Sequence, residues 1–102
     1  MNEQTEDFNE LVKQYIQSID EQADIILLFP QGKRPDEEIQ IYVLTAEKVN
    51  FELEQNYYKA CYNLELASKH NLSIYLYARE DWHNQLLNTP IYRQVSNEGI
   101  VL

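Results

Sequence analysis

Residues 24–44 read DIILLFPQGKRPDEEIQIYVL, and the two apolar segments within this stretch decide the fold. The first, residues 24–30, contains a continuous apolar run rich in β-forming residues, which is typical of a strand covered on both faces. The Gly- and Pro-containing residues 31–36 predict a turn. The second segment, residues 38–44, alternates its side chains as a strand with two different faces does. The short connection predicts that the two strands pair antiparallel.

Helical and strand patterns continue on both sides of this pair. Apolar residues spaced by three and four predict helices over residues 7–20 and 50–69. Alternation predicts a third strand over residues 72–78. Two shorter helices are predicted over residues 80–87 and 89–99, the second beginning with a Thr-Pro pair that suits a helix start.

This order, α-β-β-α-β-α-α, predicts an α/β (α+β) fold with a small mixed β-sheet. We expect the helices to pack mainly on one face of the sheet, with the first, the long and the last helix covering it together. The apolar strand residues expected beneath them are Ile39, Ile41, Val43, Leu72, Ile74 and Leu76. The long helix has so wide an apolar surface that it should contact both the sheet and another helix. His70-Asn71 is expected to end it in a left-handed turn.

Length and charge restrict the classes of function. With 102 residues the chain is expected to form one domain, residues 1–102. Its 8 basic and 17 acidic residues give a net charge of −9, which repels a polyanion, so we expect no nucleic-acid binding. The longest apolar run is too short to span a bilayer, and the acidic start lacks an apolar leader. A cytoplasmic protein without membrane contact is therefore expected.

Few residues of the kinds that carry chemistry stand out. His70 and His83 are far apart and lack metal-ligand spacing, so they are expected to be exposed polar residues. The single cysteine, Cys61, excludes an intramolecular disulfide and lies on the apolar stripe of the long helix, where a buried, unreactive thiol is expected. Asp36 and Glu38 form an acid-x-acid pair. A solvated acidic turn is the favoured interpretation of this pair, and a divalent-cation site is the alternative.

Two stretches together resemble a known family. Residues 28–41, where a strand ending in Leu-Phe is followed by a turn and PDEEIQI, are similar to the minimal nucleotidyltransferase (MNT) domain of the DNA polymerase β-like nucleotidyltransferase superfamily. The tail, with EDW at residues 80–82, TPIYR at 89–93 and EGIVL at 98–102, is similar to the C-terminal end of that family. The resemblance covers the whole chain and implies a nucleotidyltransferase-like fold.

The departures from the family pattern fall on the active site. Where the family has the Gly-Ser pair that holds nucleotide phosphates, this chain has Pro30-Gln31, and proline removes a backbone donor. The family's three catalytic acids fall on Glu38, Gln40 and Ser73. Two-metal phosphoryl transfer requires several carboxylates, and neutral Gln and Ser side chains do not supply that charge. The sequence therefore predicts a degenerate active site with no catalytic residues, no resident metal and no cofactor.

Three functions stand as hypotheses. The first is a catalytically inactive protein that acts through protein contacts. For it, the resemblance implies an antitoxin-like role beside an all-helical HEPN-type partner in a toxin–antitoxin pair. The second is a divergent Mg²⁺-dependent nucleotidyltransferase that uses Asp36 and Glu38 as its acids, with Lys33 or Arg34 on the phosphates. The third is a non-catalytic sensor of a nucleotide or small anion, with the same two basic side chains as anion contacts.

The sheet face opposite the predicted helices is rich in tyrosine. Alternation places Gln40, Tyr42, Ser73, Tyr75 and Tyr77 on it. Tyrosine is enriched in binding surfaces, so Tyr42, Tyr75 and Tyr77 are predicted to form an interface with a protein partner or with a second copy of the chain. The alternative is that this face is a wetter half of the core, with hydroxyl groups that reach solvent.

Overall fold

The computed structural model describes residues 3–30 and 37–102, and these residues form helices around a mixed β-sheet. In chain order the elements are α1 (Glu3–Gln17), β1 (Asp24–Leu28), β2 (Ile39–Thr45), α2 (Phe51–Ser68), β3 (Leu72–Ala78), α3 (Arg79–Asn84), α4 (Pro90–Glu98) and β4 (Ile100–Val101). Each helix and strand predicted from the sequence forms the expected type of element, and the turn predicted over residues 31–36 lies outside the described residues. The sequence patterns do not predict β4, because two residues are too few to show alternation.

The four strands lie in the order β3-β2-β1-β4. β1 and β2 pair antiparallel, as predicted, with Leu28 opposite Gln40. β3 lies parallel to β2, with Gln40 opposite Ser73, and β4 lies antiparallel to β1. Gly99, which joins α4 to β4, has no room for a side chain, because a Cβ atom there would lie 2.5 Å from the carbonyl oxygen of Val95. The sheet thus brings the end of the chain back against β1.

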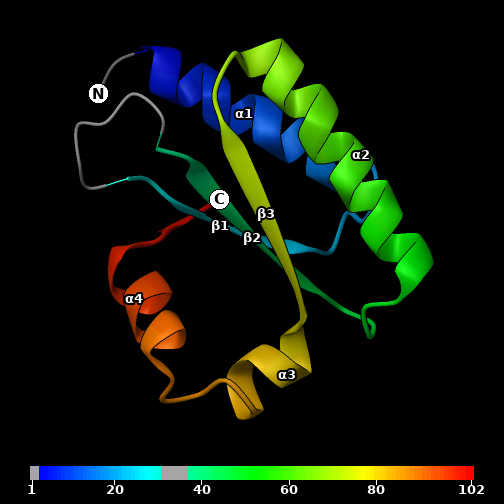
Figure 1. The fold of residues 1–102 in the computed structure, drawn as a ribbon, viewed down its shortest axis with the longest axis vertical. Coiled ribbons are helices and arrows are strands. Elements are labelled where there is room, and N and C mark those ends of the chain that lie inside the picture. The colour runs from blue at the N-terminus through cyan, green and yellow to red at the C-terminus, as the bar shows by residue number, and fades with distance from the viewer. Residues whose placement is uncertain (1–2, 31–36) are drawn as a thin grey trace.

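One face of the sheet is covered by the two longer helices, α1 and α2 (Figure 1). The buried residues of this layer are Phe8, Val12, Ile16, Ala23, Ile25, Leu27, Ile39, Ile41, Val43, Tyr57, Cys61, Leu64 and Leu72. The six strand residues predicted for this face all belong to the layer, with Ile74 and Leu76 only partly buried. α2 contacts both β3 and α1, which confirms the expectation drawn from its wide apolar surface.

The opposite face is covered by α3 and α4, so the prediction that the helices pack mainly on one face, with the last beside the first, is wrong (Figure 1). Trp82 of α3 and Val95 of α4 are buried there. They pack with Leu28, Tyr42 and Leu44 of the strands. The physical reason is that β1 and β2 carry apolar side chains on both faces, and burying each such side chain stabilises the fold by roughly 1.5–3 kcal/mol.

The ends of the helices follow local capping chemistry. The Asn50 side chain accepts a backbone hydrogen bond at the start of α2, and Thr89 does the same for α4, as predicted. α2 ends before the predicted stop at His70-Asn71, because Lys69 already takes the left-handed conformation with φ of 62°. α3 is shorter than predicted. Within the described part of the chain, none of the helices has the length and apolarity needed to span a membrane.

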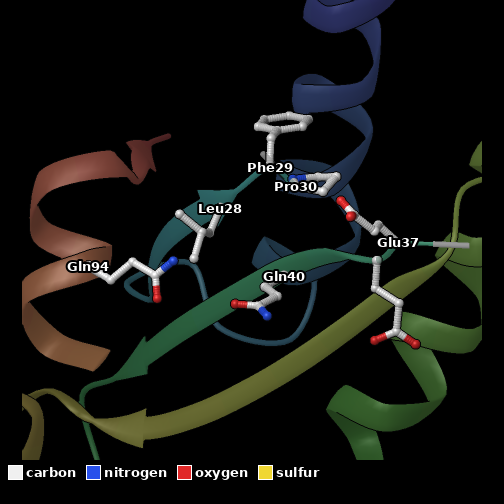
Figure 2. Close-up of a pocket in the computed structure, with 7 residues that line it drawn as sticks. Leu28, Phe29, Pro30, Glu37, Gln40 and Gln94 are labelled. Carbon is white, nitrogen blue, oxygen red and sulfur yellow. The ribbon is translucent and has the colours of Figure 1, made fainter. Parts of the chain in front are cut away.

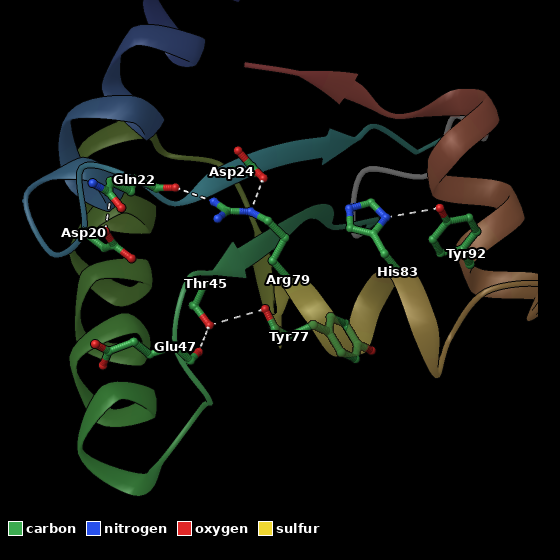
Figure 3. Close-up of polar contacts among 9 residues, drawn as sticks. All are labelled: Asp20, Gln22, Asp24, Thr45, Glu47, Tyr77, Arg79, His83 and Tyr92. Atoms are coloured by element: carbon green, nitrogen blue, oxygen red, sulfur yellow. Dashed lines mark hydrogen bonds and ion pairs between the residues drawn. The ribbon is translucent and has the colours of Figure 1, made fainter.

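Polar contacts fix the ends of the strands against one another (Figure 3). Arg79, at the start of α3, donates from Nε to Asp24 Oδ2 at 2.8 Å and from Nη2 to the carbonyl oxygen of Gln22 at 2.6 Å. The buried hydroxyl of Thr45 donates to the carbonyl oxygen of Glu47 at 2.5 Å. Because β2 lies between β1 and β3, the Arg79 contacts tie the end of β3 to the start of β1 across the intervening strand.

Truncating a buried strand residue beneath α1 and α2 should destabilise the chain strongly. Leu27 is fully buried, so Leu27→Ala is expected to lower the free energy of unfolding by about 2–5 kcal/mol. Leu87, which is 49% exposed, is the matched control, and Leu87→Ala should change that free energy by less than about 0.5 kcal/mol. Urea unfolding followed by circular dichroism measures both values. Equal effects of the two substitutions would contradict this assignment of the core.

Candidate functional site

A pocket of about 400 Å³ opens where β1 ends and β2 begins (Figure 2). Its lining residues are Leu28, Phe29, Pro30, Glu37, Glu38, Gln40 and Gln94. Figure 2 shows the Gln94 side chain extending from α4 toward Leu28. Three of the predicted site positions, Pro30, Glu38 and Gln40, therefore line a single cavity at one end of the central strand pair.

Glu38 and Gln40 lie beside the third position at which the resemblance places an acid, Ser73. Gln40 on β2 is the register partner of Ser73 on β3. The Ser73 hydroxyl donates a hydrogen bond to Glu38 Oε2. The structure thus brings these three predicted positions together, on β2, on β3 and just before β2, and the serine is bonded to the one carboxylate among them.

Gln40 has a hydrogen-bond partner of its own, the Tyr42 hydroxyl. This hydroxyl donates to Gln40 Oε1 at 2.7 Å. Tyr42 is 2% exposed, and burial, with smaller contributions from Tyr75 and Tyr77, raises the pKa of its phenol from 10.0 to about 12. The phenol therefore stays protonated at neutral pH and remains a donor. As a result, the amide oxygen of Gln40 is already engaged within the protein.

The pocket is acidic, but its neutral positions are weak metal ligands. Among the described residues that line it, the charged ones are Glu37 and Glu38. Mg²⁺ is usually bound through carboxylate and phosphate oxygens, which the amide of Gln40 in the pocket and the hydroxyl of Ser73, which bonds to Glu38 from β3, replace poorly. Among residues 3–30 and 37–102, no group of three or more His, Cys, Asp or Glu side chains that could hold a metal ion occurs. The other predicted site residues lie outside the described residues; they are Gln31, Lys33, Arg34 and Asp36.

The three predicted interface tyrosines differ in exposure. Tyr42 lies beneath Trp82, with ring centroids 5.9 Å apart, and its burial corrects the expectation that it faces a partner. Tyr77 is half-buried and packs on the same indole at 5.0 Å. Tyr75 is 38% exposed and stacks on Tyr42 at 5.1 Å. This face is therefore largely a second half of the core, and of the three tyrosines only Tyr75 keeps a large exposed part.

The predictions for the histidines and the cysteine agree with the structure. His70 and His83 are both exposed, and His83 Nδ1 lies 3.3 Å from the Tyr92 hydroxyl (Figure 3). Cys61 is buried, as predicted. Burial, with smaller contributions from two nearby carboxylates, raises the pKa of its thiol from 9.0 to about 11. Such a thiol carries little thiolate at neutral pH and is a poor nucleophile.

Two of the polar lining residues are not singled out by the sequence patterns. Gln94 reaches the pocket only because α4 covers the second face of the sheet, and no periodicity within α4 indicates which face it will cover. Glu37 belongs to the same acidic run as Glu38, and this run is a sequence feature from which its place at the site could have been predicted. Figure 2 shows its carboxylate directed toward Pro30.

Comparisons with known proteins give no match. No protein-family model, no curated protein and no solved structure matches the chain. The likeness to the MNT domain therefore depends on the motifs quoted above and stays a prediction.

Alkaline pH should destabilise the fold, because burial raises the pKa of Cys61 to about 11 and those of Tyr42 and Tyr57 to about 12. In the unfolded chain these groups titrate near 9.0 and 10.0, so between those values and the folded ones the folded state holds more protons. Their stabilising contribution is complete below about pH 9 and is lost as the pH rises toward about 12. Urea unfolding at a series of pH values measures this decline. Cys61→Ala should reduce the loss of stability in the lower part of this pH range, where the thiol titrates. An equally steep loss there in the variant would contradict the raised pKa of Cys61.

Proposed function

We propose that the chain is a nucleotidyltransferase-like protein without transferase activity that acts by binding other proteins. The proposal joins the MNT-like motifs to the side-chain contacts at the pocket. A HEPN-type partner in a toxin–antitoxin pair, which the resemblance implies, belongs to the same proposal.

The observation that carries this proposal is the engagement of the neutral residues Gln40 and Ser73. Both lie in the sheet close to Glu38, which directly precedes β2, and both are hydrogen-bonded, Gln40 to Tyr42 and Ser73 to Glu38. A two-metal site shares several carboxylates between cations about 3.5–4 Å apart, whereas these three positions offer one. The contacts therefore support a loss of metal-dependent chemistry by substitution, with the surrounding strands retained.

Protein binding is favoured by the rest of the surface. The carboxylates of Glu37 and Glu38, the charged residues in the described part of the pocket lining, together with the net charge of −9, disfavour a polyphosphate ligand there. Large apolar side chains remain exposed along α2, with Phe51 74% and Leu66 63% exposed. Exposed apolar groups gathered on one helix are typical of a surface that contacts another protein.

No nucleotidyl transfer is expected from the full chain. Incubation with radiolabelled ATP, Mg²⁺ or Mn²⁺ and candidate acceptor proteins should leave the label on the nucleotide, because Gln40 and Ser73 supply no charge to hold the cations. Glu38→Ala removes the one carboxylate among the three predicted acid positions and gives the background level of label on protein. Glu47→Ala, at an exposed glutamate that does not line the pocket, is the matched control. Label on protein with the wild type and Glu47→Ala, but not with Glu38→Ala, would overturn the proposal.

Restoring the two acids should restore a cation site. Gln40→Asp/Ser73→Asp places three carboxylates at neighbouring positions of β2 and β3, so the double variant should bind Mn²⁺ at least about tenfold more tightly than the wild type. The electron paramagnetic resonance signal of free Mn²⁺ measures this binding. Gln40→Asn/Ser73→Thr keeps both positions neutral and is the control. Equal Mn²⁺ affinities for all three proteins would show that these positions do not form a shared site.

A further inference from the structure

β3 is an edge strand, and the described residues supply no neighbouring strand on its outer side. The Ile39 N–H donates to the carbonyl oxygen of Asn71 at 2.9 Å, and in a parallel pair the residues that bond to the neighbour alternate along the strand. Odd-numbered residues of β3 therefore bond to β2, and even-numbered residues direct their backbone groups outward. Leu72 fits this alternation, since its N–H donates to Glu65 Oε2 of α2 at 3.0 Å and not to β2.

Within its own sequence β3 lacks the features that usually protect an edge strand from pairing, and the Glu65 carboxylate of α2 engages the edge at Leu72, its first residue. Leu72–Ala78 has the sequence LSIYLYA, which contains no charged residue and no proline. Edge strands are ordinarily guarded by such residues, by bulges or by being very short. β3 is seven residues long, whereas β4 at the other edge has two. A long, uncharged edge is a template for one more strand.

Large exposed side chains of α2 lie beside this edge. They are Phe51, Tyr58, Tyr62 and Leu66, with exposed fractions of 74%, 47%, 61% and 63%. Glu65 fixes the direction of Tyr58 and Tyr62, because it reaches the outer edge of β3 and these two residues precede it at spacings that share one side of a helix. Phe51 lies seven residues before Tyr58 and Leu66 four residues after Tyr62, so both extend the same row. Figure 1 shows β3 and α2 together on the near side of the molecule. We call this combined area, β3 and the four α2 side chains, the β3–α2 surface.

We propose that the β3–α2 surface is a homodimer interface, in which a second copy of the chain pairs its β3 antiparallel to the first and packs its α2 against the first α2. The dimer rests on the proposed function. It assigns the protein contacts of that function to one surface and to one partner, a second copy of the chain. A two-fold axis through the edge makes the contact self-complementary and closed. One sheet then runs through both copies, with both α2 helices on the same face.

The sequence of β3 matches itself in this arrangement. With the axis at Tyr75, Ile74 of one copy lies opposite Leu76 of the other, and the two exchange both backbone hydrogen bonds through their outward groups. Ile74 and Leu76 pack on the α1–α2 side of the sheet, so apolar groups meet there. Tyr75 meets its own copy on the other side as an aromatic cross-strand pair. Because β3 carries no charge, pairing brings no like charges together within the strands.

The exposed side chains supply more than half of the area that a standard dimer interface uses. A fully covered aromatic side chain buries about 150–250 Å², so the exposed parts of Tyr75 and the four α2 side chains provide on the order of 500 Å² per copy. A standard interface uses about 800 Å² per partner. The backbone edge of β3 and a polar rim supply the remainder.

Net charge distinguishes a second copy of the chain from a basic protein as the occupant of the β3–α2 surface. Each copy carries a charge of −9, so two copies repel one another at long range, and salt should strengthen the dimer by screening that repulsion. A basic partner would be attracted instead, and salt would weaken its binding. The sign of the salt dependence therefore identifies the occupant.

Analytical ultracentrifugation of the full chain tests the dimer. We expect a monomer–dimer equilibrium whose dissociation constant falls as salt rises from about 0.01 M to about 1 M, over which the Debye length shrinks from about 30 Å to about 3 Å. Tyr75→Glu and Tyr62→Glu each place a carboxylate in the interface and should weaken the dimer at least about tenfold. Val101→Glu, at a residue of β4 that is 74% exposed, adds the same charge and should dimerise nearly as the wild type does.

Cross-linking across the two-fold axis provides an independent measurement. Residues opposite one another in a non-hydrogen-bonded antiparallel pair have Cα atoms about 4.5 Å apart, within the range that a disulfide spans. Tyr75→Cys should therefore form a covalent dimer on mild oxidation. The wild type, whose Cys61 is buried, and Val101→Cys should stay monomeric on a denaturing gel.

Several outcomes would overturn the dimer. The first two are a wild type that stays monomeric at every concentration and salt level, and a Tyr75→Glu variant that associates as tightly as Val101→Glu. The other two are association that continues beyond two copies and association that weakens as the salt concentration rises. A failed dimer without nucleotidyl transfer rejects this interface and leaves the proposed function standing. Protein-bound label in the transfer assay rejects the proposed function, whatever the oligomeric state.

Discussion

The rest of the structure depends on the apolar character of β1 and β2 on both of their faces. Ile25 and Leu27 turn to one side of the sheet, while Leu28 and Leu44 turn to the other, and all four are buried. A sheet of this kind needs a helical layer on each side, because either face left in water would expose a row of large side chains. The layers α1–α2 and α3–α4 meet that requirement from opposite ends of the chain.

The same requirement connects the candidate site to the second layer of the core. Tyr42 packs under Trp82 and also donates its hydroxyl hydrogen bond to Gln40 at the pocket. The side chain that replaces a predicted acid is therefore held by a residue whose position is set by core packing. α4, which completes the same layer, brings Gln94 to the pocket from the other direction. The chemistry available at the pocket thus depends on how the second face of the sheet is covered.

Strand faces were predictable from the sequence, whereas the sides chosen by the helices were not. Alternation assigns Ile41 and Val43 to one face directly, since side chains in a strand point in turn to opposite sides. The short connection likewise predicts the antiparallel pairing of β1 with β2. Nothing in the periodicity of α4 states which face of the sheet it will cover, because an amphipathic helix packs equally well on either. Lys69 takes the left-handed position ahead of His70-Asn71, since the end of α2 is set by its own backbone hydrogen bonds.

At the candidate site, the sequence indicated the positions but not their contacts. Glu38, Gln40 and Ser73 were identified from the motif, and parallel pairing of β2 with β3 brings them together. The hydrogen bonds that engage Gln40 and Ser73 depend on side-chain directions that residue spacing does not determine. Tyr42 looked like a surface residue because alternation gives a face and says nothing of what covers that face.

The two edges of the sheet are unequal, and this inequality limits how far the sheet can grow. β4 covers β1 through only two residues, and the Leu102 N–H adds one more backbone bond to the carbonyl oxygen of Ile25. This short segment blocks further pairing along β1, an apolar strand that would otherwise offer a second long edge. A molecule with one open edge and one blocked edge can form a closed pair, whereas a molecule with two open edges could add further copies at both edges. In the proposed dimer, the pairing of β4 with β1 therefore confines strand addition to the β3 edge.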